Sequence, residues 1–263
     1  MTDETGTQAA ADLLWETWRG AGRIAALPEA LRPATRAEGY AIQARLEARS
    51  AQPLFGWKIA ATSRAGQAHI GVDGPLAGRI LAEMVVPEGG AVPLSDNAMR
   101  VAEPEFVFRL GRDLPPRAAD YTQAEVMAAV AALHLGIEVP DSRFADFARA
   151  GGPQLIADDA CAHRFALGLE APEEWRDLDL AAHRVQCTVA PRYEREGIGA
   201  NVLGDPRIAL TWLANELSRH GVALRAGQHV TTGTCAVPLE IRPGDAVTVD
   251  FGRLGSMGLR FVS

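Results

Sequence analysis

The sequence predicts an α+β protein, and three observations support that class. The 263 residues, of which 48% are apolar, are enough to bury a sizeable core. Helix signals dominate the first fifty residues, whereas strand signals dominate the chain after Pro53 and are interrupted only by isolated helices. Because strands and helices do not alternate regularly, we expect an α+β arrangement rather than repeated βαβ units.

Two helices are expected in the N-terminal region. Apolar and aromatic side chains recur at helical spacing over 13–18. Thr35 and Glu38 form a capping-box pattern in front of a second apolar repeat that includes Tyr40 and Ala44. The first part of the chain is therefore expected to be helical.

Strands are expected at several places after this region. The segment 54–59 is typical of a buried strand, and a glycine-rich loop is expected over 71–78. Three further strands are expected near 228–232, 246–251 and 258–262, with a glycine-rich turn before the last of them.

Two isolated helices are expected among these strands. Thr122 and Glu125 form a second capping box, which predicts a helix that continues to about His134. Asp205 is followed by a proline and predicts the start of another helix, which Gly221 ends.

Charge and cysteine content exclude several classes of protein. The net charge of −7 and the absence of a basic stripe argue against a nucleic-acid partner. The acidic start Met1–Glu4 and the lack of an apolar run of about 18 residues argue against a membrane protein. Three widely spaced cysteines fit a reducing compartment, so we expect a cytoplasmic protein.

Two acidic residues stand out in the alternating segment 101–110. As a strand, this segment places Phe106 and Phe108 on one face and Glu103 and Glu105 on the other. Two neighbouring carboxylates repel each other unless a cation lies between them. This pair is a candidate for metal binding.

A third carboxylate, Glu138, follows an apolar run in which an unpaired buried charge would cost several kcal/mol. Three carboxylates without thiolate or imidazole partners favour a hard ion, Mg²⁺ or Mn²⁺, with open coordination positions for a chelating substrate. The alternative is that Glu103 and Glu105 lie on a solvated face and that Glu138 pairs with Arg143.

Lys58 is the only lysine among the 26 Lys and Arg residues. It lies in an apolar segment, and burial is expected to lower the pKa of its amine so that it exchanges protons near neutrality. The alternative is that its head group reaches water or pairs with a single acid.

Several short motifs occur together, in a fixed order, between about Phe55 and Ser263. They are Gly56-Trp57-Lys58-Ile59, Gly71-Val72-Asp73-Gly74-Pro75, Glu103-Pro104-Glu105, Ile137-Glu138-Val139-Pro140-Asp141-Ser142-Arg143, Ile156-Ala157-Asp158-Asp159, Leu203-Gly204-Asp205-Pro206, Thr232-Gly233-Thr234, Pro243-Gly244-Asp245 and Gly255-Ser256. Together they resemble the 2-keto-4-pentenoate hydratase family of the fumarylacetoacetate hydrolase superfamily.

The resemblance implies a mixed β-roll that carries a metal, with a smaller helical region beside it. We expect a helical N-terminal region with the lysine strand and loop over residues 1–80, and a catalytic domain over residues 81–263. By resemblance, Glu103, Glu105 and Glu138 match the metal ligands and Lys58 matches the active-site lysine.

The activity that the resemblance implies is hydration of 2-hydroxy-2,4-dienoates to 4-hydroxy-2-keto acids, in the catabolism of aromatic compounds. The substrate would chelate Mg²⁺ or Mn²⁺ through its carboxylate and C2 oxygen. Lys58 would move a proton or hold the enolate oxygen. Asp73 would orient water or another proton carrier, and the alternative is that it is a plain turn residue.

The chain departs from the family pattern at Asp159 and Cys161, where relatives commonly carry asparagine and serine. Cys161 is interpreted as a small buried residue, Asp159 as a turn or cap acid, and His134 and His163 as packing or surface residues.

The residues leave other activities open. These are a decarboxylase of 4-oxalocrotonate-like diacids, a hydrolase of carbon–carbon bonds in acylpyruvates, and a non-catalytic subunit that accompanies an active relative. A homo-oligomer is expected, and a decarboxylase or aldolase of the same pathway is the further partner considered.

Overall fold

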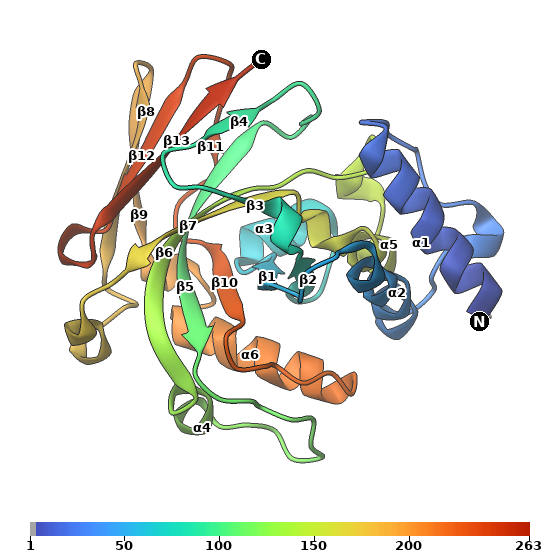
Figure 1. Ribbon diagram of the computed structural model, residues 1–263, viewed down its shortest axis with the longest axis horizontal. Helices are drawn as coiled ribbons and strands as arrows, with labels where there is room; N and C mark the ends of the chain where they lie inside the picture. The colour runs from blue at the N-terminus through green and yellow to red at the C-terminus, as the bar shows by residue number, and fades with distance from the viewer. Residues whose placement is uncertain (1–3) are drawn as a thin grey trace.

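The computed structural model describes residues 4–263 and combines two curved sheets with a group of short helices (Figure 1). The α-helices are α1 (Glu4–Arg19), α2 (Arg36–Gln43), α3 (Arg64–Ile70), α4 (Gln123–Met127), α5 (Gly152–Ala157) and α6 (Pro206–Arg219). Residues 1–3, which carry most of the acidic start noted above, lie outside the described residues. The predicted α+β class is confirmed.

Thirteen strands make up the sheets in the described part of the chain. They are β1 (Gly56–Ala60), β2 (Leu76–Ile80), β3 (Val85–Val86), β4 (Ala91–Pro93), β5 (Val101–Leu110), β6 (Val130–Val139), β7 (Arg164–Glu170), β8 (Arg184–Ala190), β9 (Tyr193–Ile198), β10 (His229–Thr234), β11 (Leu239–Glu240), β12 (Ala246–Asp250) and β13 (Ser256–Val262).

The larger sheet has the order β2-β1-β10-β5-β6-β7-β3, with β11 also paired to β5. The smaller sheet has the order β4-β13-β12-β8-β9. Both sheets mix parallel and antiparallel pairs, since β1 runs parallel to β10 and β13 runs parallel to β4. This matches the mixed β-roll expected from the resemblance.

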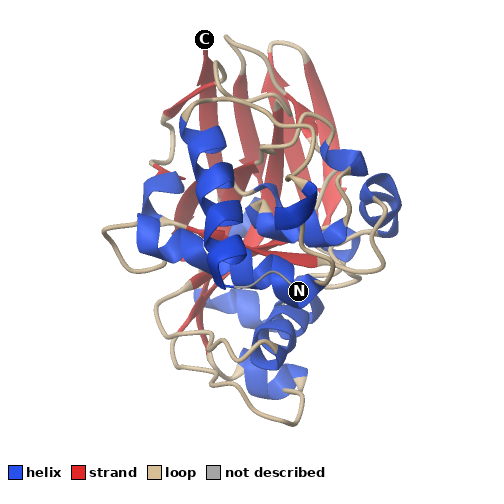
Figure 2. Cartoon of the chain, turned by 90° about the vertical axis from the view of Figure 1, so that its right-hand side faces the viewer, coloured by secondary structure: helices blue, strands red, loops and turns tan. Residues whose placement is uncertain are grey.

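The two faces of the larger sheet have different coverings. Phe106, on one face of β5, lies against Phe251 next to the smaller sheet, with ring centroids 5.0 Å apart. Val107, on the opposite face, belongs to an apolar cluster with Met84 and Phe165, against which Trp18 of α1 packs. Figure 2 shows helices gathered in front of the strands. Glu103 and Glu105 share the face of Val107 because side chains alternate along a strand.

The core between the two sheets supplies much of the stabilisation. Phe106 and Phe251 are fully buried there. Each such side chain contributes roughly 1.5–3 kcal/mol relative to an exposed one. The face that carries the carboxylates is therefore held in place by packing on its opposite side.

The N-terminal helices form as expected. The Thr35 hydroxyl accepts a hydrogen bond from the Glu38 N–H, and the Glu38 carboxylate accepts one from the Thr35 N–H, which completes the capping box of α2. Asp205 caps α6 by accepting a hydrogen bond from Arg207 N–H. The strands predicted near 228–232, 246–251 and 258–262 are also present, as β10, β12 and β13.

Two boundaries predicted from the sequence are wrong. The helix opened by Thr122 ends at Met127, and His134 lies in the middle of β6, because a ten-residue apolar segment gains more from pairing between β5 and β7. The loop expected over 71–78 ends at Pro75, because β2 pairs along its whole length with β1. In both cases tertiary pairing overrides the local signal.

The described helices include none that is both long and apolar enough to cross a bilayer. The division of the chain near residue 80 stays a prediction. Strand β1 pairs with β10, and β2 pairs with β1, so both strands belong to the larger sheet.

Candidate metal centre

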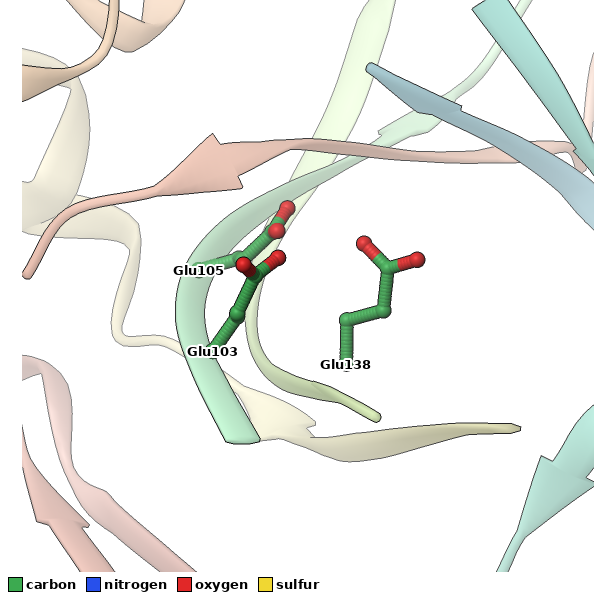
Figure 3. A group of neighbouring side chains, drawn as sticks. All are labelled: Glu103, Glu105 and Glu138. Carbon is green, nitrogen blue, oxygen red and sulfur yellow. The ribbon is translucent and has the colours of Figure 1, made fainter. Parts of the chain in front are cut away.

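Three carboxylates converge where β5 pairs with β6. The antiparallel register places Glu103 directly opposite Glu138, and Glu105 lies two residues further along the same face of β5. One oxygen from each side chain lies within 4.8 Å of the others (Figure 3). The structure therefore brings together the three acids that the sequence singled out.

Several oxygens in this cluster accept no hydrogen bond from the described residues. Glu105 Oε1 and Glu138 Oε2 are buried in this state, and Glu138 Oε1 has an ion pair with Lys58 at 3.0 Å. Buried carboxylate oxygens normally accept hydrogen bonds, so unpartnered ones need another ligand. A cation that binds all three side chains would satisfy them.

Glu105 is held in one orientation by strand β10. Its Oε2 accepts hydrogen bonds from the Thr231 hydroxyl and from Gly233 N–H, the latter at 2.6 Å. The pairing of β10 with β5 is interrupted between Thr231 and Thr234, which turns the Gly233 N–H toward the carboxylate. Gly233 has a φ of +103°, and a Cβ there would lie 2.2 Å from the Thr62 hydroxyl oxygen, so only glycine fits.

Crowding of the acids raises their pKa values. Burial, followed by the charge of Glu138, raises the pKa of Glu103 to about 7. Burial and the charges of Glu138 and Glu103 raise the pKa of Glu105 well above its ordinary value. Burial also raises the pKa of Glu138, and Lys58 partly offsets this effect. The cluster is strained electrostatically unless positive charge is added.

The donor atoms fit a hard divalent cation. All three side chains offer oxygen, and no imidazole or thiol completes the group within the described residues. Mg²⁺ and Mn²⁺ prefer such oxygen ligands, whereas softer ions prefer nitrogen or sulfur. The residues present therefore fit a hard ion with coordination positions left open.

Lys58 lies next to this cluster on β1. Its amine donates a hydrogen bond to the Ala160 carbonyl at 2.8 Å and lies 3.0 Å from Glu138 Oε1. Burial alone would lower the pKa of Lys58, but the charges of Glu138 and Glu103 outweigh burial and raise it. The expectation of a lowered pKa was wrong because the sequence did not place the acids around the amine.

The structure also gives the positions of the remaining residues that the sequence singled out. Arg143 forms its ion pair with Asp158 rather than with Glu138. Asp73 lies exposed in the loop between α3 and β2, and its charge acts on Arg36. His134 and His163 are buried, in keeping with a packing role.

A crevice too narrow to hold a water molecule lies beside Glu138. It is lined by Ile80, Met84, Glu138, Ala162, His163, Arg164 and Phe165. Most of this lining is apolar.

Sequence reasoning missed the groups that hold the cluster in place. Thr231 and Gly233 were noted only as part of a resemblance or a strand, and Ala160 was not singled out. The signal for Gly233 was a glycine between two threonines at a predicted strand end, which is typical of a bulge.

Comparison with known proteins identifies the family. Residues 63–262 match the family described as fumarylacetoacetate (FAA) hydrolase, C-terminal. A 2-keto-4-pentenoate hydratase from Paraburkholderia phymatum is 33% identical over 264 residues, which covers 99% of each chain. The chain belongs to the fumarylacetoacetate hydrolase family.

Other members of the fumarylacetoacetate hydrolase family are nearly as similar. A 4-oxalocrotonate decarboxylase from a Pseudomonas species is 33% identical over 202 residues, which covers 77% of this chain and 76% of the relative. The solved structure of the 4-oxalocrotonate decarboxylase from Pseudomonas putida G7, complexed with magnesium and adipate, superposes with a TM-score of 0.89. It is 28% identical and covers 100% of this chain and 99% of that one.

The raised pKa values predict how the metal-free protein responds to pH. The folded chain retains protons on these carboxyls that the unfolded chain releases above about pH 4.5. The contribution of these carboxyls to the free energy of unfolding is therefore largest at acidic pH and falls as the pH rises toward about 7, the pKa of Glu103. Thermal melts of EDTA-treated protein between about pH 5 and about pH 8 measure this trend.

Two additions sharpen this measurement. Excess Mg²⁺ should raise the melting temperature more at the alkaline end, where the carboxylates are free to bind it. Glu105→Gln should flatten the pH dependence of the metal-free protein. An identical pH dependence in metal-free Glu105→Gln and in the metal-free parent protein would contradict the assignment of the pKa shifts.

Proposed function

We propose that this chain is a hydro-lyase that adds water to 2-hydroxy-2,4-dienoates of the 2-keto-4-pentenoate type. The product would be a 4-hydroxy-2-keto acid, and the reaction would belong to the catabolism of aromatic compounds. The observation that carries this proposal is the single lysine amine lying 3.0 Å from one of three converged carboxylates. The near full-length similarity to 2-keto-4-pentenoate hydratases supports it.

Glu103, Glu105 and Glu138 are the residues proposed to hold the metal, Mg²⁺ or Mn²⁺. When bound, the ion supplies a Lewis acid and a template for the substrate carboxylate and C2 oxygen. Thr231 and Gly233 support this role by fixing one oxygen of Glu105 while leaving the other free.

The reaction consists of two balanced steps. In the first, the C2 hydroxyl of the dienoate loses a proton and C5 gains one, which gives the 2-keto-3-enoate. In the second, the oxygen of water bonds to C4 and a proton is added to C3. One water molecule is consumed and no redox partner is needed.

Lys58 is proposed to move protons in these steps or to hold the developing oxygen charge. Its Nζ is tied to Ala160 and Glu138, and the acids around it keep the amine protonated. A protonated amine beside the C2 oxygen donates a hydrogen bond as negative charge develops there. Asp73, exposed before β2, remains a prediction for a residue that orients water or another proton carrier.

The crevice beside Glu138 offers little positive charge for a second carboxylate. Arg164 is the only basic side chain in its lining, and it lies 3.7 Å from Asp96 Oδ2. Burial and nearby arginines lower the pKa of His163 to about 3, so this imidazole is neutral at pH 7. A diacid would find little unmatched positive charge on this side of Glu138, which favours a substrate whose far end is uncharged.

The proposal is tested by mixing purified protein and Mg²⁺ or Mn²⁺ with 2-hydroxypenta-2,4-dienoate. Loss of the dienol absorbance should be accompanied by formation of 4-hydroxy-2-ketopentanoate, identified by mass spectrometry. Incubation in H₂¹⁸O should place one heavy oxygen at C4. Dienol that disappears without incorporation of solvent oxygen at C4 would refute hydration.

The second candidate is decarboxylation of a 4-oxalocrotonate-like diacid. The fold similarity to the solved decarboxylase favours it. The same assay with the diacid decides between the two, because release of carbon dioxide with a higher kcat/KM than hydration would make the protein a decarboxylase.

Lys58→Ala should lower kcat by about a hundredfold or more, the usual contribution of an acid–base group. The metal dissociation constant should change little, because the amine is not a ligand. Lys58→Arg is the matched control, since it keeps a charge but cannot move protons near neutrality. Turnover that survives in both variants would remove Lys58 from the mechanism.

Glu105→Gln should weaken metal binding by about tenfold to a hundredfold or more, because it removes one of three anionic ligands. Isothermal titration with Mn²⁺ measures this directly. Glu170→Gln is a suitable control, since Glu170 is an exposed acid on β7 that pairs with Arg109. Equal Mn²⁺ affinity in the Glu105→Gln variant and the parent protein would remove the metal site.

A further inference from the structure

The turn between α5 and β7 has an unusual backbone conformation. Asp159, Ala160 and Cys161 have φ angles of +55°, +49° and +64°. Residues with a Cβ seldom adopt this left-handed conformation, and three in succession are rarer still. Such strain persists only where surrounding contacts hold it, and it is concentrated at functional sites.

Asp159 is the side chain that ties this turn to the larger sheet. Its Oδ1 accepts a hydrogen bond of 2.6 Å from the backbone N–H of Arg79 in β2. The far end of the turn is fixed as well, because the Cys161 carbonyl accepts a 2.9 Å hydrogen bond from Asp141 N–H. The turn is thus anchored at both ends.

This anchor is costly to bury. Asp159 is completely buried, and its Oδ2 has no hydrogen-bond partner among the described residues. That side chain borders a small hollow beneath α1, whose other lining includes Trp15 and Trp18. Burial raises the pKa of Asp159 to about 7. An apolar residue would pack here at lower cost, so the carboxyl serves something other than packing.

The middle of the turn contacts the lysine. Ala160 presents its carbonyl to Lys58 Nζ at 2.8 Å, the same amine that lies 3.0 Å from Glu138. Gly78 of β2 makes this approach possible. A Cβ at Gly78 would lie 2.4 Å from the Asp159 carbonyl oxygen and 2.9 Å from both Cγ and Cδ of Lys58.

We propose that Asp159 is a positioning residue for Lys58. Its carboxyl holds the strained turn against β2, and the turn holds the lysine amine, through the Ala160 carbonyl, against Glu138. The catalytic consequence rests on the proposed function, but the position of the amine does not. Asp159 itself is not expected to touch the substrate.

The single lysine makes this proposal directly measurable. Protein grown with ¹³C-labelled lysine gives the Cε signal of one lysine residue, whose chemical shift and line width report the environment of the amine. In Asp159→Ala, this signal should shift and broaden, and the rate of amine labelling by trinitrobenzenesulfonate should rise at least about tenfold as the amine becomes exposed to reagent and solvent.

Activity supplies a second measurement on the same variants. Asp159→Ala should lower kcat about tenfold to a hundredfold, the usual cost of a misplaced catalytic group, with KM and the Mn²⁺ dissociation constant nearly unchanged. Asp159→Asn retains the oxygen that accepts from Arg79 N–H, so both the lysine signal and kcat should stay within about twofold of the parent protein.

Asp245→Ala is the matched control for general destabilisation. Asp245 is also buried, accepts a hydrogen bond from Arg242 N–H and pairs with Arg192, but it precedes β12 in the smaller sheet. Its loss should lower the melting temperature and leave the lysine signal unchanged. A lysine signal that moves equally in both variants would overturn the proposal.

Gly78→Ala tests the same contact from the other side if Asp159→Ala does not fold. The added methyl group pushes on the turn and on the lysine stem without removing a charge, and it should displace the Cε signal. An unshifted signal in either folded variant would refute the positioning role. A parent protein without hydratase activity but with these spectral changes would refute the proposed function alone.

Discussion

Mutual repulsion among three neighbouring carboxylates, two of them buried, is the constraint on which the rest of the site depends. Glu103, Glu105 and Glu138 place oxygens within 4.8 Å of one another in a setting that already disfavours charge. One ammonium group, from Lys58, offsets part of this repulsion. The remaining unsatisfied oxygens explain why a dication fits the cluster better than any arrangement of hydrogen bonds among the described side chains.

The larger sheet makes this arrangement possible because one of its faces packs the core and the other carries the carboxylates. One face of β5 packs Phe106 and Phe108 into the main apolar core, and this face stabilises the fold. The alternate residues of the same strand point to the other face of the sheet. There Glu103 lies beside Glu138 of β6, and Glu105 lies beside residues of β10. Because register is fixed by the packed face, the carboxylates keep their relative positions despite their repulsion.

Local patterns were enough to predict the parts of the fold that depend on local chemistry. The capping box at Thr35, the alternation over 101–110 and the helix after Asp205 were all predicted correctly. α3 was missed, although Ser63 caps its start and Gly71 ends it, because seven residues give too short a repeat to recognise. The helix predicted to continue to His134 failed for the opposite reason, since pairing with distant strands decided the conformation.

The sequence indicates the three acids of the candidate site but not the groups that hold them in position. Three glutamates in apolar or alternating segments stand out in a single sequence, because unpaired buried charge is rare. The groups that orient them, Thr231, Gly233 and the Ala160 carbonyl, are ordinary residues whose role depends on contacts between segments far apart in the chain. The direction of the Lys58 pKa shift was predicted wrongly for the same reason. The apolar segment indicates burial of the amine, but the sequence does not show which charged side chains lie beside it.

Several features of the candidate site lower the stability of the fold, and they lie close together. Raised carboxyl pKa values, a left-handed turn and an unpartnered oxygen on Asp159 all destabilise the fold, and all lie on the helical side of the larger sheet. Their common feature is their location: each lies either in the carboxylate cluster or in the turn whose Ala160 carbonyl holds the lysine amine. Such destabilising features around the carboxylate cluster and the lysine amine are better explained by selection for chemistry than by selection for stability.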